Sequence, residues 1–198
     1  MAKEFWDQRY AEDGFVYGHH PNIFFCKKLG KLAPGRLLLP GEGEGRNAVY
    51  AARRGWEVVA FDQSTKGREK ALKLASQKKV NIEYQVCKTD DFEAEQESFD
   101  CLALIFVHFH AEERKRIHQK LFSYLKPGGT LIMEVFSKDQ LGRESGGPQH
   151  IDLLYLEKDL CEDFPRLQSF HIEQTEIELK EGRYHEGKAS VIRLVGKK

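Results

Sequence analysis

The stretch Leu37-Leu38-Leu39-Pro40-Gly41-Glu42-Gly43-Glu44-Gly45-Arg46-Asn47 decides the fold of this sequence. Its three leucines form a short apolar run typical of a buried strand, which Pro40 and Gly41 end. Alanines and a valine at helical spacing then predict a helix over residues 44–54. Glycines let the backbone approach a ligand closely, and a helix that begins there offers free N–H groups. The stretch therefore predicts a strand, a glycine-rich turn and a helix that together bind a ligand.

Apolar runs alternate with helical patterns along the rest of the chain. Strands are expected at residues 36–39, 56–61, 81–86, 99–105 and 130–136, and helices at 44–54, 64–78 and 111–125. The last of these helices is expected to end at Lys126-Pro127-Gly128-Gly129, because proline cannot continue a helix and glycine permits a left-handed exit. Such alternation is typical of βαβ units and a parallel sheet with helices on both faces.

The pattern changes after residue 150. A short helix is expected at 157–164, followed by strands at 169–179 and 188–195. Their connector is too short for a parallel crossover, so the two strands should be antiparallel. The apolar positions change phase between Ile172 and Ile177, which predicts a bulge there. The expected fold is a Rossmann-like three-layer α/β/α sandwich, whose mostly parallel seven-stranded sheet carries a C-terminal antiparallel hairpin.

Two further helices are expected before residue 36, at residues 4–12 and 21–32. The aromatic loop between them, residues 13–20, has two open interpretations, a surface connector or a flap over a ligand. The length of 198 residues favours a single domain. Within it, residues 1–35 are expected to form a helical cap over the ligand site and residues 36–198 a Rossmann-like core.

Composition excludes several classes of protein. Lys and Arg number 31, as do Asp and Glu, so the chain lacks the basic surplus of a nucleic-acid binder. No run approaches the roughly 18 apolar residues of a membrane span, and the charged N-terminus does not resemble a signal peptide. The four cysteines are far apart, which argues against a metal site or a disulfide framework. We therefore expect a cytoplasmic protein with neither a nucleic-acid nor a membrane partner.

The ligand is expected to contain adenosine. Asp62 ends the second strand roughly 20 residues after Gly41, where a carboxylate accepts hydrogen bonds from ribose hydroxyls. Arg46 occupies the place of the third glycine of the dinucleotide fingerprint, which disfavours a pyrophosphate and hence a nicotinamide-dependent oxidoreductase. No phosphate-binding G-x-x-x-x-G-K-[ST] motif occurs. S-adenosylmethionine remains as the obvious ligand, and a non-catalytic domain that binds it stays open as an alternative.

Four segments in order also carry a family resemblance: residues 37–47, 89–92, 99–105 and 126–131. From about residue 36 to its end, the chain resembles class I S-adenosylmethionine-dependent methyltransferases. It looks closest to the tellurite-resistance and thiopurine methyltransferase-like group. That narrower match rests on Phe5-Trp6-Asp7-x-Arg9-Tyr10, Tyr17-Gly18-x-x-Pro21-Asn22, Gly43-Glu44-Gly45-Arg46-Asn47-Ala48 and Gln140-Leu141-Gly142-Arg143.

The resemblance implies a set of residues for the cofactor. The methionine part would lie on the glycine turn, the ribose on Asp62, and the adenine beside the acidic residues and aromatic ring that follow the third strand. Leu39 stands where such enzymes usually carry an acidic residue, and Glu42 is a candidate to replace that charge. The full expected set is Gly41, Glu42, Gly43, Arg46, Asn47, Asp62, Gln63, Asp90, Asp91, Phe92, Ile105 and Phe106.

The expected acceptor is a small molecule, by resemblance a thiol or another chalcogen nucleophile. His108 follows the fourth strand and is the candidate general base, since histidine titrates near neutral pH; an acceptor that arrives ionised needs none. The candidate acceptor-binding residues are Trp6, Tyr17, His108, Arg143 and Tyr155, each with core packing or a solvated loop as its alternative interpretation. Residues 104–107 lack the [DNS]-P-P-[FYW] signature of base-amino methylation. A monomer and a homodimer both stay open.

Overall fold

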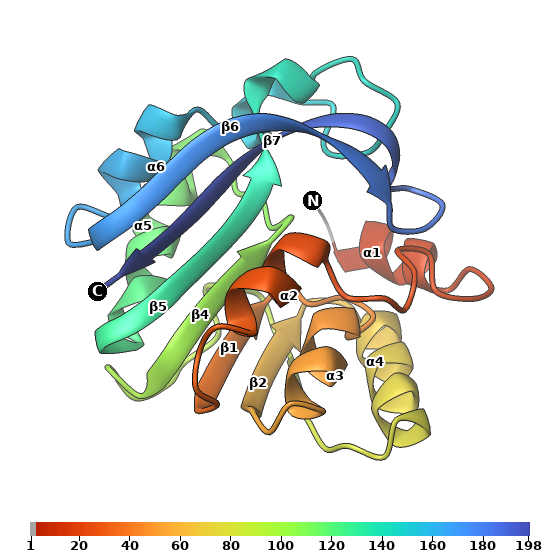
Figure 1. The fold of residues 1–198 in the computed structure, drawn as a ribbon. Helices are drawn as coiled ribbons and strands as arrows, with labels where there is room; N and C mark the ends of the chain where they lie inside the picture. The colour runs from red at the N-terminus through yellow and green to blue at the C-terminus, as the bar shows by residue number, and fades with distance from the viewer. Residues whose placement is uncertain (1–2) are drawn as a thin grey trace.

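In the computed structural model, which describes residues 3–198, one seven-stranded sheet runs through the chain (Figure 1). Its order is β3-β2-β1-β4-β5-β7-β6, and β7 is antiparallel to both of its neighbours while the remaining pairs are parallel. The strands are β1 Arg36–Pro40, β2 Glu57–Asp62, β3 Glu83–Val86, β4 Phe99–Ile105, β5 Leu125–Phe136, β6 Gln168–Lys180 and β7 Glu186–Lys197. The predicted fold class is confirmed.

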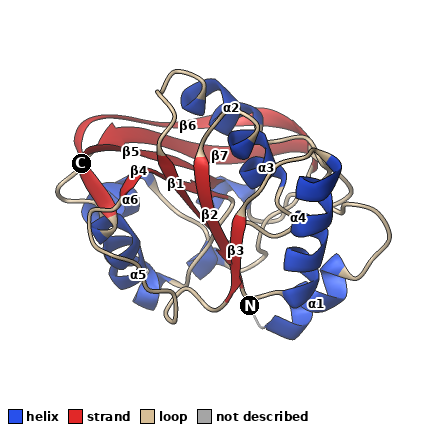
Figure 2. Cartoon of the chain, turned by 90° about the horizontal axis from the view of Figure 1, so that it is seen from below, coloured by secondary structure: helices blue, strands red, loops and turns tan. Residues whose placement is uncertain are grey.

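Helices cover both faces of this sheet (Figure 2). They are α1 Lys3–Tyr10, α2 Ile23–Leu29, α3 Arg46–Ala52, α4 Thr65–Gln77, α5 Ala111–Ser123 and α6 Glu157–Asp163, with 3₁₀ turns at Lys138–Gln140 and Ile151–Leu153. Helices α2, α3 and α4 share one apolar core with the sheet, and α5 and α6 share the other. Within residues 3–198, no helix is long and apolar enough to cross a membrane.

Strand β1 shows why the sequence reads as a continuous apolar run. Leu37 and Leu39 pack with α2 and α3, whereas Leu38 points to the opposite face and packs with α5. All three leucines are at most 1% exposed. A strand buried on both faces needs apolar side chains at every position, which alternation alone would not reveal.

The prediction that residues 126–129 end a helix is wrong, because these residues belong to β5. Helix α5 ends at Ser123, and β5 begins at Leu125 opposite Phe99, with a shift of register before Cys101. The Gly128 N–H donates to the Lys198 carbonyl, and the Lys198 N–H donates to the Gly129 carbonyl. Pairing with the C-terminal residue therefore draws this proline- and glycine-containing segment into the strand.

The prediction of a bulge between Ile172 and Ile177 is wrong. Strand β6 pairs with β7 without a break from His171 to Lys180, and the shift of register lies between Gln168 and His171, where Ser169 has a φ of 45°. Strand β6 is an edge strand, and most of its side chains are exposed. The alternation of apolar residues along β6 therefore does not indicate how β6 pairs with β7.

The glycine turn is held in a tight space. Gly45 precedes α3 with a φ of 84°, and a Cβ at this position would lie 2.5 Å from the Cβ of Ala71 on α4. Real Cβ atoms do not approach so closely. Gly45 is thus required both for its left-handed backbone and for the packing of α4 beside the turn.

We expect Gly45→Ala to lower the free energy of unfolding by about 2–4 kcal/mol, because left-handed strain and overpacking add. Gly14→Ala is the matched control: Gly14 has a φ of 75°, and a Cβ added there would meet nothing within 4 Å. It should lose only about 1 kcal/mol, the left-handed cost alone. Urea denaturation of both variants checks this, and equal losses would contradict the packing argument.

Candidate active site

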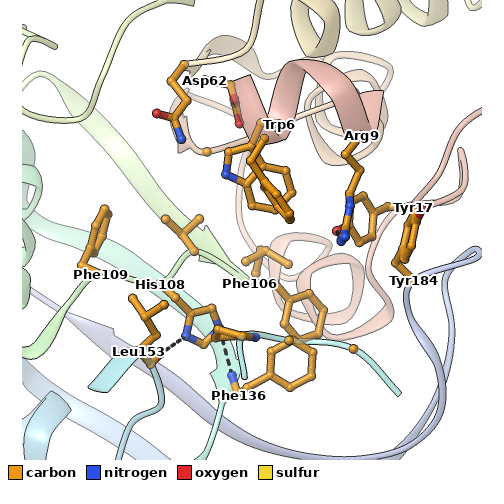
Figure 3. A pocket seen from close by; sticks show the side chains of 18 of the residues that line it. Trp6, Arg9, Tyr17, Asp62, Phe106, His108, Phe109, Phe136, Leu153 and Tyr184 are labelled. Carbon is orange, nitrogen blue, oxygen red and sulfur yellow. Dashed lines mark hydrogen bonds between the residues drawn. The ribbon is translucent and has the colours of Figure 1, made fainter. Parts of the chain in front are cut away.

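A cavity of about 1160 Å³ lies at the carboxyl ends of the parallel strands, next to the glycine turn. Figure 3 shows Asp62 and Trp6 toward one end of it, and His108, Phe136 and Leu153 toward the other. Pockets for a single small ligand usually measure about 300–1,000 Å³. This cavity therefore has room for two ligands side by side.

Most of the predicted site residues meet at this cavity. From the expected cofactor set, the lining includes Gly41, Glu42, Arg46, Asn47, Asp62, Gln63, Asp90, Ile105 and Phe106. From the expected acceptor set, it includes Trp6, Tyr17, His108 and Arg143. The parallel topology brings them together, since the turns that follow β1, β2 and β4 all open at the same edge of the sheet.

Four predicted residues do not line the cavity: Gly43, Asp91, Phe92 and Tyr155. Phe92 is 1% exposed and stacks on Phe61 at 4.3 Å inside the core. Tyr155 is fully buried, and its hydroxyl accepts the Phe109 N–H at 2.6 Å. Both aromatic rings therefore support the wall from behind and do not face a ligand.

Gly43 and Asp91 lie outside the cavity for different reasons. Gly43 is covered by α1, since a Cβ there would lie 2.5 Å from the hydroxyl oxygen of Tyr10. The Asp91 side chain is exposed outside the cavity, whereas its neighbour Asp90 reaches the lining and pairs with Arg116. Of the two acidic candidates after β3, only Asp90 remains at the site.

Asp62 is the carboxylate that ties the glycine turn to α4. One of its oxygens accepts the Gly43 N–H at 3.1 Å, and the other accepts the Ser64 N–H at 2.8 Å. Burial raises the pKa of Asp62 to about 6. Each carboxylate oxygen can accept more than one hydrogen bond, so Asp62 keeps acceptor capacity on the cavity side.

Glu42 uses its side chain to cap α3. Gly45, which precedes the helix, has no side chain to offer, and Glu42 accepts the Ala48 N–H at 2.7 Å and the Asn47 amide at 3.4 Å. Burial raises the pKa of Glu42 to about 7. Leu39 is 1% exposed in the apolar core. The Glu42 carboxylate, the candidate to replace the acidic residue that is missing at Leu39, therefore points toward α3.

The loop at residues 13–20 is fixed to the glycine turn by a residue that the sequence analysis did not single out. Glu44 accepts the Val16 and Tyr17 N–H groups at 3.2 and 3.1 Å and forms an ion pair with Lys70 at 2.9 Å. The arrangement places Tyr17 in the cavity wall. An acidic residue inside a glycine turn is the sequence signal that could have indicated such an anchor.

Aromatic rings form the wall on the side of α1. Trp6 stacks on Tyr10, with ring centroids 5.4 Å apart. Arg9 lies 3.9 Å over the ring of Tyr184 and donates to the Tyr17 hydroxyl at 3.0 Å. Figure 3 shows Trp6, Arg9, Tyr17 and Tyr184 along this side. Aromatic faces attract cations, so the wall suits a positively charged ligand.

His108, the predicted general base, has both ring nitrogens engaged. Nδ1 donates to the Leu153 carbonyl at 2.7 Å, and Nε2 accepts the Phe136 N–H at 3.3 Å (Figure 3). Burial lowers the pKa of His108 to about 4. His108 therefore joins the segment after β4 to the end of β5 and offers no free lone pair to an acceptor molecule in this arrangement.

Two arginines of the predicted set also have partners. Arg46 donates to Glu181 at 2.8 Å and to the Tyr17 carbonyl at 3.1 Å, so it points to the connection between β6 and β7. Arg143 forms an ion pair with Glu176 at 2.7 Å. The same connection brings His185 into the cavity wall, a residue without a surrounding motif in the sequence. Across residues 3–198, no group of three or more His, Cys, Asp or Glu could hold a metal ion.

Comparison with known proteins gives the site its context. Residues 38–129 match the model of a methyltransferase domain family. The chain is 32% identical over 144 residues to probable thiol methyltransferase 2 of Arabidopsis thaliana, covering 71% of this chain and 62% of the relative. It is also 32% identical over 139 residues to a ubiquinone biosynthesis O-methyltransferase of Xanthomonas campestris pv. campestris, covering 70% of this chain and 58% of the relative. The chain thus spans about three fifths of the length of these curated relatives.

Among solved structures, TehB of Haemophilus influenzae shares the fold. It superimposes with a TM-score of 0.71 at 14% identity and covers 99% of this chain and 66% of its own. The family match, the two relatives and this fold agree with the order of motifs along the sequence. The chain belongs to the class I S-adenosylmethionine-dependent methyltransferases.

Proposed function

We propose that this chain transfers a methyl group from S-adenosylmethionine to a small-molecule acceptor, and that the acceptor is a thiol or a related chalcogen nucleophile. The observation that carries the proposal is the cavity itself. It joins the glycine turn and Asp62 at one end to an aromatic, largely buried end near Phe106 and Phe136, within about 1160 Å³. A donor and an acceptor have to meet in such a space.

The cavity residues fit the cofactor. Gly41 offers a close backbone approach with a φ of 60°, and Asp62 offers a cavity-lining carboxylate for the ribose hydroxyls. Gln63, Asp90 and Ile105 are the remaining candidates around the nucleoside. Phe106, from the same expected set, stacks on Phe136 and so lies toward the acceptor end. When bound, S-adenosylmethionine supplies a methyl group on a positively charged sulfur. Trp6 and the rings beside it would favour that charge.

The cap formed by residues 1–35 belongs to the same proposal, although its first two residues lie outside the described part of the chain. Trp6, Arg9, Tyr10 and Tyr17 bring this segment to the cavity. Their role is to align the reactants and to exclude water, which is most of what a displacement on an already activated carbon requires. Residues 36–198 would provide the core on which this cap lies.

The acceptor class rests on likeness and on charge. One relative is named as a thiol methyltransferase, another as a ubiquinone biosynthesis O-methyltransferase, and others as tRNA methyltransferases. The zero net charge of this chain disfavours a polyanionic RNA acceptor. A non-catalytic binding domain is the competing proposal, and formation of S-adenosylhomocysteine separates the two.

We expect Asp62→Ala to weaken the binding of S-adenosylmethionine at least tenfold, since the ribose hydroxyls lose their acceptor. Isothermal titration calorimetry with S-adenosylmethionine, S-adenosylhomocysteine and NAD measures this. Asp91→Ala, the same truncation at an exposed carboxylate outside the cavity, is the control and should bind like wild type. Heat from NAD, or an unchanged affinity in Asp62→Ala, would contradict the proposal.

Binding of S-adenosylmethionine should also weaken as the pH falls through about 6. The pKa of Asp62 is raised to about 6, and ribose hydroxyls donate best to the ionised carboxylate. A ligand that prefers the ionised form loses affinity when protons compete for that form. Titrations across a pH series should give a constant affinity above this value and a decline below it. An affinity that rises toward acid pH would exclude Asp62 as the ribose acceptor.

His108→Ala should destabilise the protein without changing the shape of the pH–rate profile. The substitution leaves the buried Leu153 carbonyl and Phe136 N–H without partners, at a cost of about 1–3 kcal/mol. Urea denaturation and the rate of methyl transfer at several pH values measure the two effects. Loss of the acid limb of the profile would restore His108 as the general base.

A further inference from the structure

His185 is a buried titratable side chain of the cavity wall that the proposed function leaves unused. It lies in the connection between β6 and β7, only 6% exposed, and its ring lines the cavity. The ring packs edge-on against Phe106 and Tyr17, each with centroids 4.7 Å away, and against Phe136 at 5.5 Å. These contacts fix the plane of the imidazole ring.

The nitrogens of His185 differ from those of His108 in one decisive respect. Nδ1 is buried without a hydrogen bond, and its nearest ion-pair partner is Glu181, with an Nδ1–Oε2 distance of 3.5 Å. No hydrogen bond within residues 3–198 uses Nε2. His185 therefore keeps a nitrogen available to a ligand, whereas His108 has none.

Glu181 is itself held firmly. Its carboxylate accepts from Arg46 at 2.8 Å and from the Asn22 amide at 3.0 Å. Burial raises the pKa of Glu181, but His185 and Arg46 outweigh it and lower the value to about 2. An ionised carboxylate beside Nδ1 favours a proton on that nitrogen and leaves the lone pair on Nε2. It also stabilises the imidazolium that forms if Nε2 takes up a proton.

Burial keeps His185 neutral in the resting protein. Burial lowers its pKa first, Arg46 and Arg9 lower it further, and Glu181 raises it, so the pKa lies below the usual value. The rings of His108 and Tyr17 are further titratable groups beside His185. Burial lowers the pKa of His108 and raises that of Tyr17, so neither adds a charge at neutral pH. A neutral histidine is the form that can accept a proton.

The position of His185 suits the acceptor and not the cofactor. The glycine turn follows β1 and Asp62 ends β2. Phe106 follows β4 and Phe136 ends β5. His185 packs on those two rings, across the point where the strand order passes from β1 to β4. In an in-line displacement the nucleophile has to approach from the side away from the leaving sulfur.

We propose that Nε2 of His185, with the ring oriented by Glu181, accepts the proton of the acceptor's thiol group. The S–H bond breaks, both of its electrons stay on sulfur as the nucleophilic pair, and the proton forms a bond to Nε2. The imidazolium, paired with Glu181, later returns the proton to water. This inference rests on the proposed function and narrows its acceptor to a thiol that is still protonated at neutral pH, as most are, with a pKa of about 8.5.

Two thiols of different acidity test the assignment in the full-length protein. For His185→Asn at neutral pH, we expect the rate with an aliphatic thiol to fall by about 10²–10⁴, the usual contribution of a general base. The rate with an aromatic thiol, already largely ionised, should fall less than about threefold, which also shows that the variant is folded. Glu181→Gln should follow the same pattern with a smaller loss. His171→Asn, an exposed histidine on β6, is the matched control and should keep both rates.

A measurement without turnover accompanies the rates. Nitrogen-15 NMR of the histidine side chains, without cofactor, should show His185 neutral at pH 7 with its proton on Nδ1, and Glu181→Gln should remove that preference. A proton on Nε2, or equal losses with both thiols in His185→Asn, would overturn the role of His185 and leave the proposed function standing. No turnover of either thiol by wild type would overturn both.

Discussion

The buried ion pair between Arg46 and Glu181 is the contact on which the arrangement of the cavity depends. Both side chains are about nine-tenths buried, and they connect the first turn of α3 with the distant β6–β7 connection. Asn22 donates to Glu181 and to Glu134, which in turn pairs with Arg193. Removing one member of such a buried pair typically costs about 3–5 kcal/mol, because the other charge is left without compensation. The network thus forces the glycine turn, α2 and the C-terminal hairpin to take up one relative position.

That network also explains how a segment near the N-terminus becomes part of a site built on the sheet. Arg46 donates to the Tyr17 carbonyl, and Glu44 accepts the Tyr17 N–H. The backbone of Tyr17 is therefore bonded on both sides by residues that belong to the glycine turn. The aromatic loop is consequently held as a wall, an outcome that neither a surface connector nor a flap describes fully.

The elements could be predicted from local patterns, and the partners of the side chains could not. The strand, turn and helix at residues 36–54 follow from apolar runs and glycines, and Asp62 follows from its spacing. Phe92 and His108 lie in equally clear motifs. Phe92 is nevertheless buried in the core, and both ring nitrogens of His108 form hydrogen bonds with backbone groups. His185 has no motif at all, because the rings of Phe106 and Phe136 that surround it lie far away in the sequence and only the fold brings them to the β6–β7 connection. A histidine can act as a base only if one ring nitrogen is free of hydrogen bonds. Its hydrogen-bond partners come from distant parts of the chain, so a local sequence pattern does not predict them.

The exposed edge strand β6 has a consequence for how copies of this chain can meet. An unpaired edge offers a row of backbone N–H and C=O groups to any other strand. Here the edge carries Glu173, Glu176 and Glu178, and the Gln174 N–H is already taken by Glu157 of α6. Two copies aligned edge to edge would set glutamates against glutamates, and like charges opposite one another destabilise a strand pair. Repulsion between these carboxylates thereby disfavours growth of the sheet by addition of a second copy at β6.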